Sequence, residues 1–249
     1  MAIADLRKIE VIAHRGAPRE APENTMASFK RAAAQGADWI EFDLRRTSDG
    51  RGVVIHDAKL NRTTDGKGRI RDYTEAQLRE FDAGSWFSPD FAGERVPLFD
   101  ETLEWAKNAG MPLHVELKDR KLENFTIDCL RNHDMLDRVV ISSFNINSLW
   151  RVRRIEPHAR LAPIIVAHPK IGFLSHELAP EFIQLWSFYT LNRKVVERAS
   201  GVNIGINAWL VDSFRLLVRA AKRGVSGVVT NEVSLIRRTI DQTKPDRWF

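Results

Sequence analysis

Short apolar runs alternate along the chain with longer stretches whose apolar residues follow helical spacing. Eight apolar runs have the length of buried strands, at residues 9–13, 38–44, 112–118, 138–142, 160–166, 182–188, 202–209 and 225–230. Eight stretches typical of amphipathic helices follow them, at residues 24–35, 100–109, 121–132, 146–155, 175–180, 191–199, 212–223 and 232–240. This alternation is typical of βα units and a parallel sheet. Eight units in 249 residues predict an α/β fold, a (β/α)8 TIM barrel, with a doubly wound sheet as the alternative.

One segment interrupts the alternation, at about residues 45–99. It is too long for an ordinary βα loop, carries a further apolar run at 53–55 and several Gly-containing turn signals, and ends at Pro97. We therefore predict a single barrel domain over residues 1–249 with an inserted subdomain after strand two. Because loops at the carboxyl ends of barrel strands carry function, the insertion is expected over the active site.

Composition and charge narrow the possible functions. Hydrophobic residues make up 43% of the chain and charged residues 29%, which excludes a disordered or fibrous protein. The net charge of +5 comes from dispersed basic residues, since Arg215, Arg219 and Lys222 have the spacing of the wet face of a helix. We therefore expect no nucleic-acid partner, although a positive cleft could still attract a small phosphate-bearing molecule.

The single cysteine and the first residues bear on the compartment. Cys129 cannot form an internal disulfide and is expected to be buried for structural reasons. The first residues lack the apolar core of a signal peptide, and no uncharged run approaches the roughly 18 residues that span a bilayer. We expect a cytoplasmic protein without a stable membrane anchor, and leave its oligomeric state open.

Two predicted strands carry alternating charged residues. Residues two apart share a face of a strand, so Glu41 and Asp43 point into the barrel from strand 38–44, and Glu116 and Lys118 do so from strand 112–118. Three neighbouring carboxylates need a compensating cation, and oxygen ligands suit Mg²⁺ or Ca²⁺. The alternative is an ion-pair network without a metal.

Two histidines directly follow apolar runs. His14 follows run 9–13 and His56 follows run 53–55, which places both at the reactive face of a barrel. Histidines near a metal suit a general acid and a general base. Arg15 adds a planar fork for phosphate, and Trp209 faces the mouth either as an aromatic wall for substrate or as core packing. The histidines without such a context are assigned to the surface or loops: 133, 158, 168 and 176.

An ordered series of motifs covers most of residues 9–118. It consists of His14-Arg15-Gly16, Pro22-Glu23-Asn24-Thr25, Glu41-x-Asp43, Asp49-Gly50, His56-Asp57, Arg62-Thr63-Thr64-x-Gly66-x-Gly68, Asp82-x-Gly84 and Glu116-x-Lys118. The series resembles the glycerophosphodiester phosphodiesterase family. Weaker similarities continue at Ser143-Phe144, Trp209 and 227–230.

The resemblance implies a metal-dependent hydrolase on a TIM barrel with an insertion after strand two. It would cleave glycerophosphodiesters to glycerol 3-phosphate and an alcohol, so the expected partner is a small-molecule substrate. The implied roles are a divalent cation on Glu41, Asp43 and Glu116 with Glu23 assisting, an acid/base pair of His14 and His56, and phosphate contacts from Arg15 and Lys118.

The second half of the chain departs from the family pattern. Where the family often has Trp-Thr-Val-Asn and Thr-Asp, this chain has Trp209-Leu210-Val211-Asp212 and Thr230-Asn231, and segment 167–199 fits poorly. We expect these departures to shape the alcohol pocket and hence the choice of substrate. Three alternatives stay open: a phospholipase C-like enzyme, a lysophospholipase D-like enzyme acting on a lipid headgroup, or a non-catalytic phosphoester-binding module.

Overall fold

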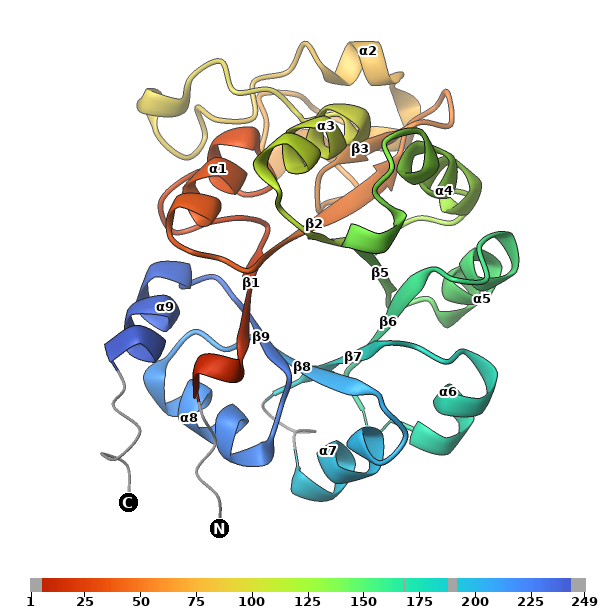
Figure 1. The fold of residues 1–249 in the computed structure, drawn as a ribbon. Helices are drawn as coiled ribbons and strands as arrows, with labels where there is room; N and C mark the ends of the chain where they lie inside the picture. The colour runs from red at the N-terminus through yellow and green to blue at the C-terminus, as the bar shows by residue number, and fades with distance from the viewer. Residues whose placement is uncertain (1–5, 168, 188–191, 243–249) are drawn as a thin grey trace.

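The computed structural model describes residues 6–167, 169–187 and 192–242 and shows a closed barrel (Figure 1). Its eight parallel strands are β1 Glu10–His14, β2 Trp39–Arg46, β4 Leu113–Leu117, β5 Val139–Ser143, β6 Arg160–Ile165, β7 Phe182–Trp186, β8 Gly205–Trp209 and β9 Gly227–Thr230. The barrel closes because β1 pairs with both β2 and β9. The predicted TIM barrel is confirmed, and the doubly wound sheet is wrong.

Helices surround the strands on the outside of the barrel (Figure 1). They are α1 Met26–Ala34, α3 Phe99–Ala109, α4 Glu123–Asn132, α5 Ile146–Ile155, α6 Ile171–Glu177, α7 Arg193–Ser200, α8 Phe214–Arg223 and α9 Val233–Gln242. Short 3₁₀ turns precede β1 and β5, at η1 Leu6–Lys8 and η5 Leu136–Arg138. Within the described ranges, no helix is long and apolar enough to cross a bilayer.

Two predicted boundaries in the second half are wrong. Helix 175–180 is α6, which begins at Ile171 and ends at Glu177, because the left-handed backbone at Ala179 (φ 46°) stops the helix before Pro180. Strand 202–209 is β8, which begins only at Gly205. The chain before it turns through Asn203 (φ 58°) and cannot be extended there.

The segment between β2 and α3 folds against the upper part of β2 (Figure 1). It contains the antiparallel strand β3 Gly52–Val54, the helix α2 Glu75–Leu78 and the 3₁₀ turns η2 Leu60–Arg62, η3 Ile70–Asp72 and η4 Pro89–Phe91. A cluster of buried apolar residues holds it together: Val53, Ile55, Leu60, Ile70, Leu78, Ala83 and Val96. This cluster explains how a segment of this length keeps a defined shape beside the barrel.

Alternation along each strand separates two further cores. Outward residues such as Ile40 and Phe42 pack in a large cluster with apolar residues of the helices. Inward residues such as Ile12 and Trp39 form a small plug with neighbours on other strands. The inward positions nearer the carboxyl ends of β2 and β4 are polar, and they form the site described next.

Candidate active site

Three carboxylates meet where β2 and β4 end. The register of the two strands sets Asp43 beside Glu116, and Glu41 lies two residues before Asp43 on the same face. Carboxylate oxygens of the three residues lie within 4.8 Å of one another, and the residues are only 1–7% exposed. This set of oxygen donors fits a hard divalent cation.

Two cations flank the three carboxylates. Arg15 Nε lies 3.2 Å from Asp43 Oδ2, and Lys118 Nζ lies 3.3 Å from Asp43 Oδ1 and 2.8 Å from Glu116 Oε1. Burial opposes the charge of Lys118, but Asp43 and Glu116 raise its pKa. Three carboxylates against two cations would leave a net negative charge if all were ionised.

The carboxylates differ in their affinity for protons. Burial, followed by the charge of Asp43, raises the pKa of Glu41 well above its usual range and that of Glu116 to about 7. Burial also disfavours the charge of Asp43, but Arg15 and Lys118 outweigh it and lower the pKa of Asp43 to about 2. Asp43 therefore favours the ionised form, whereas Glu41 and Glu116 bind protons more readily than free carboxylates do.

The loop after β1 brings Arg15 over the cluster. Arg15 and Gly16 both have left-handed backbone, with φ of 58° and 87°. A Cβ on Gly16 would lie 2.4 Å from Ser28 Oγ, so only glycine fits there. The Arg15 amide donates to the backbone carbonyl of Glu41 at 2.8 Å, which fixes the loop against β2.

Asn24 also belongs to the site, although the sequence analysis assigns it no role beyond its place in the motif Pro22-Glu23-Asn24-Thr25. Thr25 is the N-cap of α1, and its side chain accepts from the Ser28 amide. Asn24 instead donates from Nδ2 to Asp43 Oδ2 at 2.9 Å, and it is 3% exposed with left-handed backbone. The sequence signal for this role is the motif itself, because an asparagine beside a capping threonine is by itself too common to indicate a contact with Asp43.

His14 is held by residues that follow the neighbouring strands β9 and β8. Its Nδ1 lies 2.7 Å from Asn231 Oδ1, and Asn231 donates from Nδ2 and from its backbone amide to the Asp212 carboxylate, both at 2.7 Å. Because Asp212 can only accept from the amide nitrogen, Asn231 presents its oxygen to His14, and we assign the proton to Nδ1. Burial and the charge of Arg15 lower the pKa of His14 to about 4.

The contact of His14 with Asn231 corrects one expectation. The sequence assigns the departures Asp212 and Asn231 to the alcohol pocket, but they orient a histidine beside the carboxylates. The strand order explains the error, because β9 pairs with β1 and so the residues after β9 lie beside His14. Of segment 167–199, residues 168 and 188–191 lie outside the described residues.

His56 has a carboxylate partner within its own loop. Its Nδ1 lies 2.7 Å from Asp57 Oδ1, and Asp57 is in turn bound by Arg62. Burial lowers the pKa of His56, while hydrogen bonds from Arg62 lower the pKa of Asp57. Arg62 and Arg15 both bind Glu23, at 2.8 and 2.9 Å. Glu23 is therefore occupied by two guanidinium groups and lies outside the cluster of three carboxylates.

Three aromatic side chains lie together at the carboxyl ends of β5, β7 and β8 and form an aromatic wall. The Trp209 ring stacks on Trp186 at 6.5 Å between centroids and meets Phe144 edge-on at 5.7 Å. Lys118 Nζ lies 5.7 Å from the Phe144 ring, so the wall adjoins the cations of the site. Phe144 is 50% exposed, and in the sequence it stands out only as part of a short motif.

Of the four histidines that the sequence assigns to the surface or to loops, the three within the described residues lie apart from the site. His133 pairs with Asp100, and His158 and His176 are exposed. His168 lies outside the described residues.

Comparisons with known proteins agree with this geometry. The Glycerophosphoryl diester phosphodiesterase family matches residues 14–235. A glycerophosphodiester phosphodiesterase of Caldanaerobacter subterraneus is 33% identical over 93% of this chain and 99% of its own length. A glycerophosphodiester phosphodiesterase of Bacillus subtilis is 30% identical over 93% of this chain and 86% of its own.

Solved structures give the same result. A phosphodiesterase of Oleispira antarctica in complex with the product sn-glycerol-3-phosphate is 30% identical, with a TM-score of 0.87 over 94% of this chain and 97% of that one. A glycerophosphodiester phosphodiesterase of Agrobacterium tumefaciens is 26% identical, with a TM-score of 0.85 over 92% of this chain and 99% of that one.

Proposed function

Because the chain belongs to the glycerophosphoryl diester phosphodiesterase family, we propose that it hydrolyses glycerophosphodiesters to glycerol 3-phosphate and an alcohol. The observation that carries this proposal is one mouth that combines three buried carboxylates, two cations and two histidines. The product bound to the Oleispira antarctica relative supports the substrate class. A protein that only binds phosphoesters does not need two histidines that can each accept a proton at Nε2.

Glu41, Asp43 and Glu116 are the proposed ligands of one divalent cation, Mg²⁺ or Ca²⁺. All donors are oxygen atoms on two adjacent strands, which is the ligand type that these ions prefer. When bound, the cation supplies Lewis-acid stabilisation of negative charge on a phosphoryl oxygen.

Arg15 and Lys118 are the proposed phosphate contacts. Both already lie against Asp43, so a phosphate above the carboxylates meets two positive charges from opposite sides. Charge that develops on the phosphoryl oxygens in the transition state is then stabilised by groups that need not move into place.

His14 and His56 are the proposed acid and base. Both hold a hydrogen bond through Nδ1, which leaves Nε2 of each neutral ring free to accept a proton. The histidine that acts as base is neutral and takes the proton of the glycerol 2-hydroxyl at Nε2 as the hydroxyl oxygen attacks phosphorus. The histidine that acts as acid starts as the imidazolium and gives its Nε2 proton to the leaving alkoxide. Water then opens the cyclic phosphate with the roles of the two histidines exchanged.

Trp209 and Phe144 form the proposed apolar wall against the substrate.

The test is release of glycerol 3-phosphate from glycerophosphocholine, followed with a coupled enzyme. We expect release with Mg²⁺ or Ca²⁺, loss in EDTA and recovery when the cation is restored. His14→Ala and His56→Ala are each expected to lower kcat by about a hundredfold or more, whereas the matched surface variant His158→Ala keeps wild-type activity. Full activity in EDTA would exclude the metal role, and wild-type rates in both variants would remove the histidines from the reaction.

A further inference from the structure

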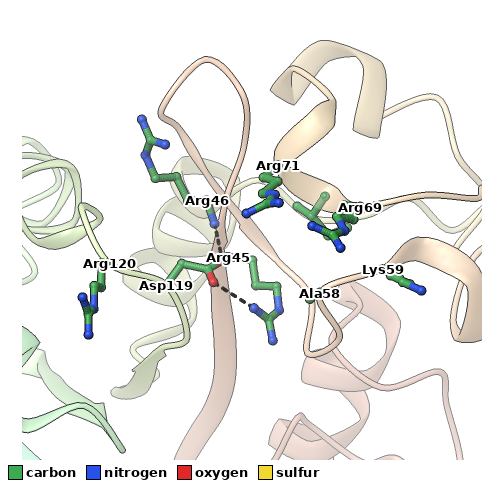
Figure 2. A pocket seen from close by; sticks show the side chains of 9 residues that line it. Arg45, Arg46, Ala58, Lys59, Arg69, Arg71, Asp119 and Arg120 are labelled. Carbon is green, nitrogen blue, oxygen red and sulfur yellow. Dashed lines mark hydrogen bonds and ion pairs between the residues drawn. The ribbon is translucent and has the colours of Figure 1, made fainter.

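A basic pocket of about 400 Å³ lies at the rim of the mouth, between the end of β2, the loop after β4 and the segment that follows β3 (Figure 2). We call it the arginine pocket. Its lining residues are Arg45, Arg46, Ala58, Lys59, Arg69, Ile70, Arg71, Asp119 and Arg120. Figure 2 shows Arg69 and Arg71 on one side of the pocket and Arg120 on the other, with Asp119 and Arg45 between them.

The charge of the arginine pocket is not balanced within the fold. Six cationic side chains and one carboxylate line it, which gives a formal charge of six minus one, or +5. The carboxylate is already engaged, because Asp119 accepts from Arg45 at 2.9 Å and from the Arg46 amide at 3.1 Å. This local excess equals the net charge of the whole chain.

Several of these cations lack a partner. Across the described residues, Lys59, Arg69 and Arg120 form no ion pair, and Arg71 has only Asp72 at 4.0 Å. Like charges held together repel one another, and guanidinium groups around a concave space bind phosphate with two parallel hydrogen bonds each. The arrangement therefore suits an anion with several acceptor oxygens.

The arginine pocket adjoins the proposed active site. Arg45 lies two residues beyond Asp43 on the same face of β2, a step of about 7 Å along a strand. Arg45 Nε donates to the backbone carbonyl of His56 at 2.6 Å, and Asp119 directly follows Lys118. A small molecule whose phosphodiester lies at Asp43 can thus place a second group in the arginine pocket.

We propose that the arginine pocket binds a phosphate carried by the leaving alcohol of the substrate. This inference rests on the proposed function and names its substrate class: glycerophosphodiesters whose alcohol is itself phosphorylated. Water and the diester give glycerol 3-phosphate and a phosphorylated alcohol, and the second phosphate leaves with the alcohol unchanged. The pocket is a concave space of about 400 Å³, the size of a small-molecule site, so a flat anionic lipid surface fits it less well.

The test compares two substrates that differ only in the second phosphate. They are glycerophosphoglycerol and the same diester with a phosphate on its terminal glycerol hydroxyl. We expect the wild-type kcat/KM to be about tenfold or more higher for the phosphorylated diester at low salt, and the ratio to fall as NaCl is raised. A wild-type ratio near one overturns the proposal.

Two sets of variants locate the effect. Arg69→Ala/Arg71→Ala should bring the ratio close to one and leave the rate on glycerophosphoglycerol unchanged, and Arg120→Ala on the opposite wall should reduce the ratio less. The matched control Arg219→Ala/Lys222→Ala removes two positive charges from α8, on the far side of the barrel, and should keep the wild-type ratio (Figure 1). A preference that survives Arg69→Ala/Arg71→Ala overturns the proposal.

A binding measurement separates failure of this inference from failure of the proposed function. If neither diester is hydrolysed, the proposed function fails, and calorimetry with inorganic pyrophosphate in EDTA still tests the arginine pocket. Binding that weakens about tenfold in Arg69→Ala/Arg71→Ala, but not in the α8 control, supports an anion site there. No binding by the wild type overturns it. Binding to phosphatidylglycerol vesicles that depends on Arg69 and Arg71, with a substrate ratio near one, assigns these residues to a lipid headgroup and also overturns it.

Discussion

The carboxylate cluster and the arginine pocket both lie at the carboxyl end of β2, but they treat charge in opposite ways. Glu41, Asp43 and Glu116 are almost fully buried, and each interacts with an opposite charge of Arg15 or Lys118. Arg69 and Arg120 are exposed and unpaired within the described structure. Buried ions must be compensated inside the protein, whereas water screens exposed ions at little cost. The cluster therefore depends on the fold around it, and the arginine pocket is free to receive its counter-charge from a ligand.

The largest effect is expected from a substitution in the buried carboxylate cluster. Asp43→Asn removes the carboxylate that pairs with both Arg15 and Lys118 and accepts from Asn24. We expect kcat/KM to fall by about a thousandfold, since a metal ligand and the orientation of two phosphate contacts are lost together. Glycerol 3-phosphate release and calorimetric Mg²⁺ or Ca²⁺ affinity are the measurements. Glu104→Gln, an exposed carboxylate of α3, is the control, and activity within a few-fold of wild type in Asp43→Asn would contradict the assignment.

The partners of His14 give the next largest effect. Asn231→Ala removes the acceptor of Nδ1, and we expect kcat to fall by about a hundredfold because tautomer and orientation are no longer fixed. The exchange Asp212→Asn/Asn231→Asp places a carboxylate directly on His14 and an amide behind it. This double variant should recover activity, with the pKa of His14 raised and the acidic limb of the kcat/KM profile moved to higher pH. An unchanged profile would show that His14 does not set this limb.

Metal affinity should depend on pH. Glu41 and Glu116 have raised pKa values, that of Glu116 being about 7, and a carboxylate must lose its proton to bind a cation. Affinity should therefore rise with pH below about 7, by up to about tenfold per unit for each proton displaced, and level off above the pKa values. Calorimetry in buffers of different ionisation enthalpy counts the released protons. Glu116→Gln should remove one of them, and a flat dependence in the wild type would contradict the raised pKa values.

The smallest effect on stability is expected from substitutions in the exposed arginine pocket. Arg69→Ala/Arg71→Ala should change the free energy of unfolding by no more than about 0.5 kcal/mol, because these charges have no strong partner to lose. Urea titration at low salt measures this. A loss of several kcal/mol would mean that the arginines hold the insertion in place, and the contrast with the buried cluster would disappear.

The site residues in the first half of the chain are largely predictable from the sequence. Alternation in strands 38–44 and 112–118 is enough to place Glu41, Asp43, Glu116 and Lys118 in one mouth. Those positions follow from the two-residue period of a strand, which is a local property. Asn24 cannot be assigned in the same way, because its hydrogen bond to Asp43 spans two elements and leaves no periodic signal.

The basic residues show the limit of sequence analysis most clearly. The sequence suggests dispersed charge, and along the chain Arg45, Lys59, Arg69 and Arg120 are indeed far apart. The antiparallel pairing of β3 with β2 and the packing of η3 on β2 gather them around one pocket. Their gathering depends on contacts between distant segments.

Residue order alone specifies the barrel, the face on which the carboxylates lie and the two histidines at strand ends, because these follow from local periodicity and from the chemistry of neighbouring residues. Three other features arise only in the folded chain: Asn231 and Asp212 hold His14, two arginines occupy Glu23, and the scattered cations form the arginine pocket. These features depend on barrel closure and on the packing of the insertion against β2. Both bring together side chains that are distant in the sequence, and no sequence pattern indicates that those side chains are in contact.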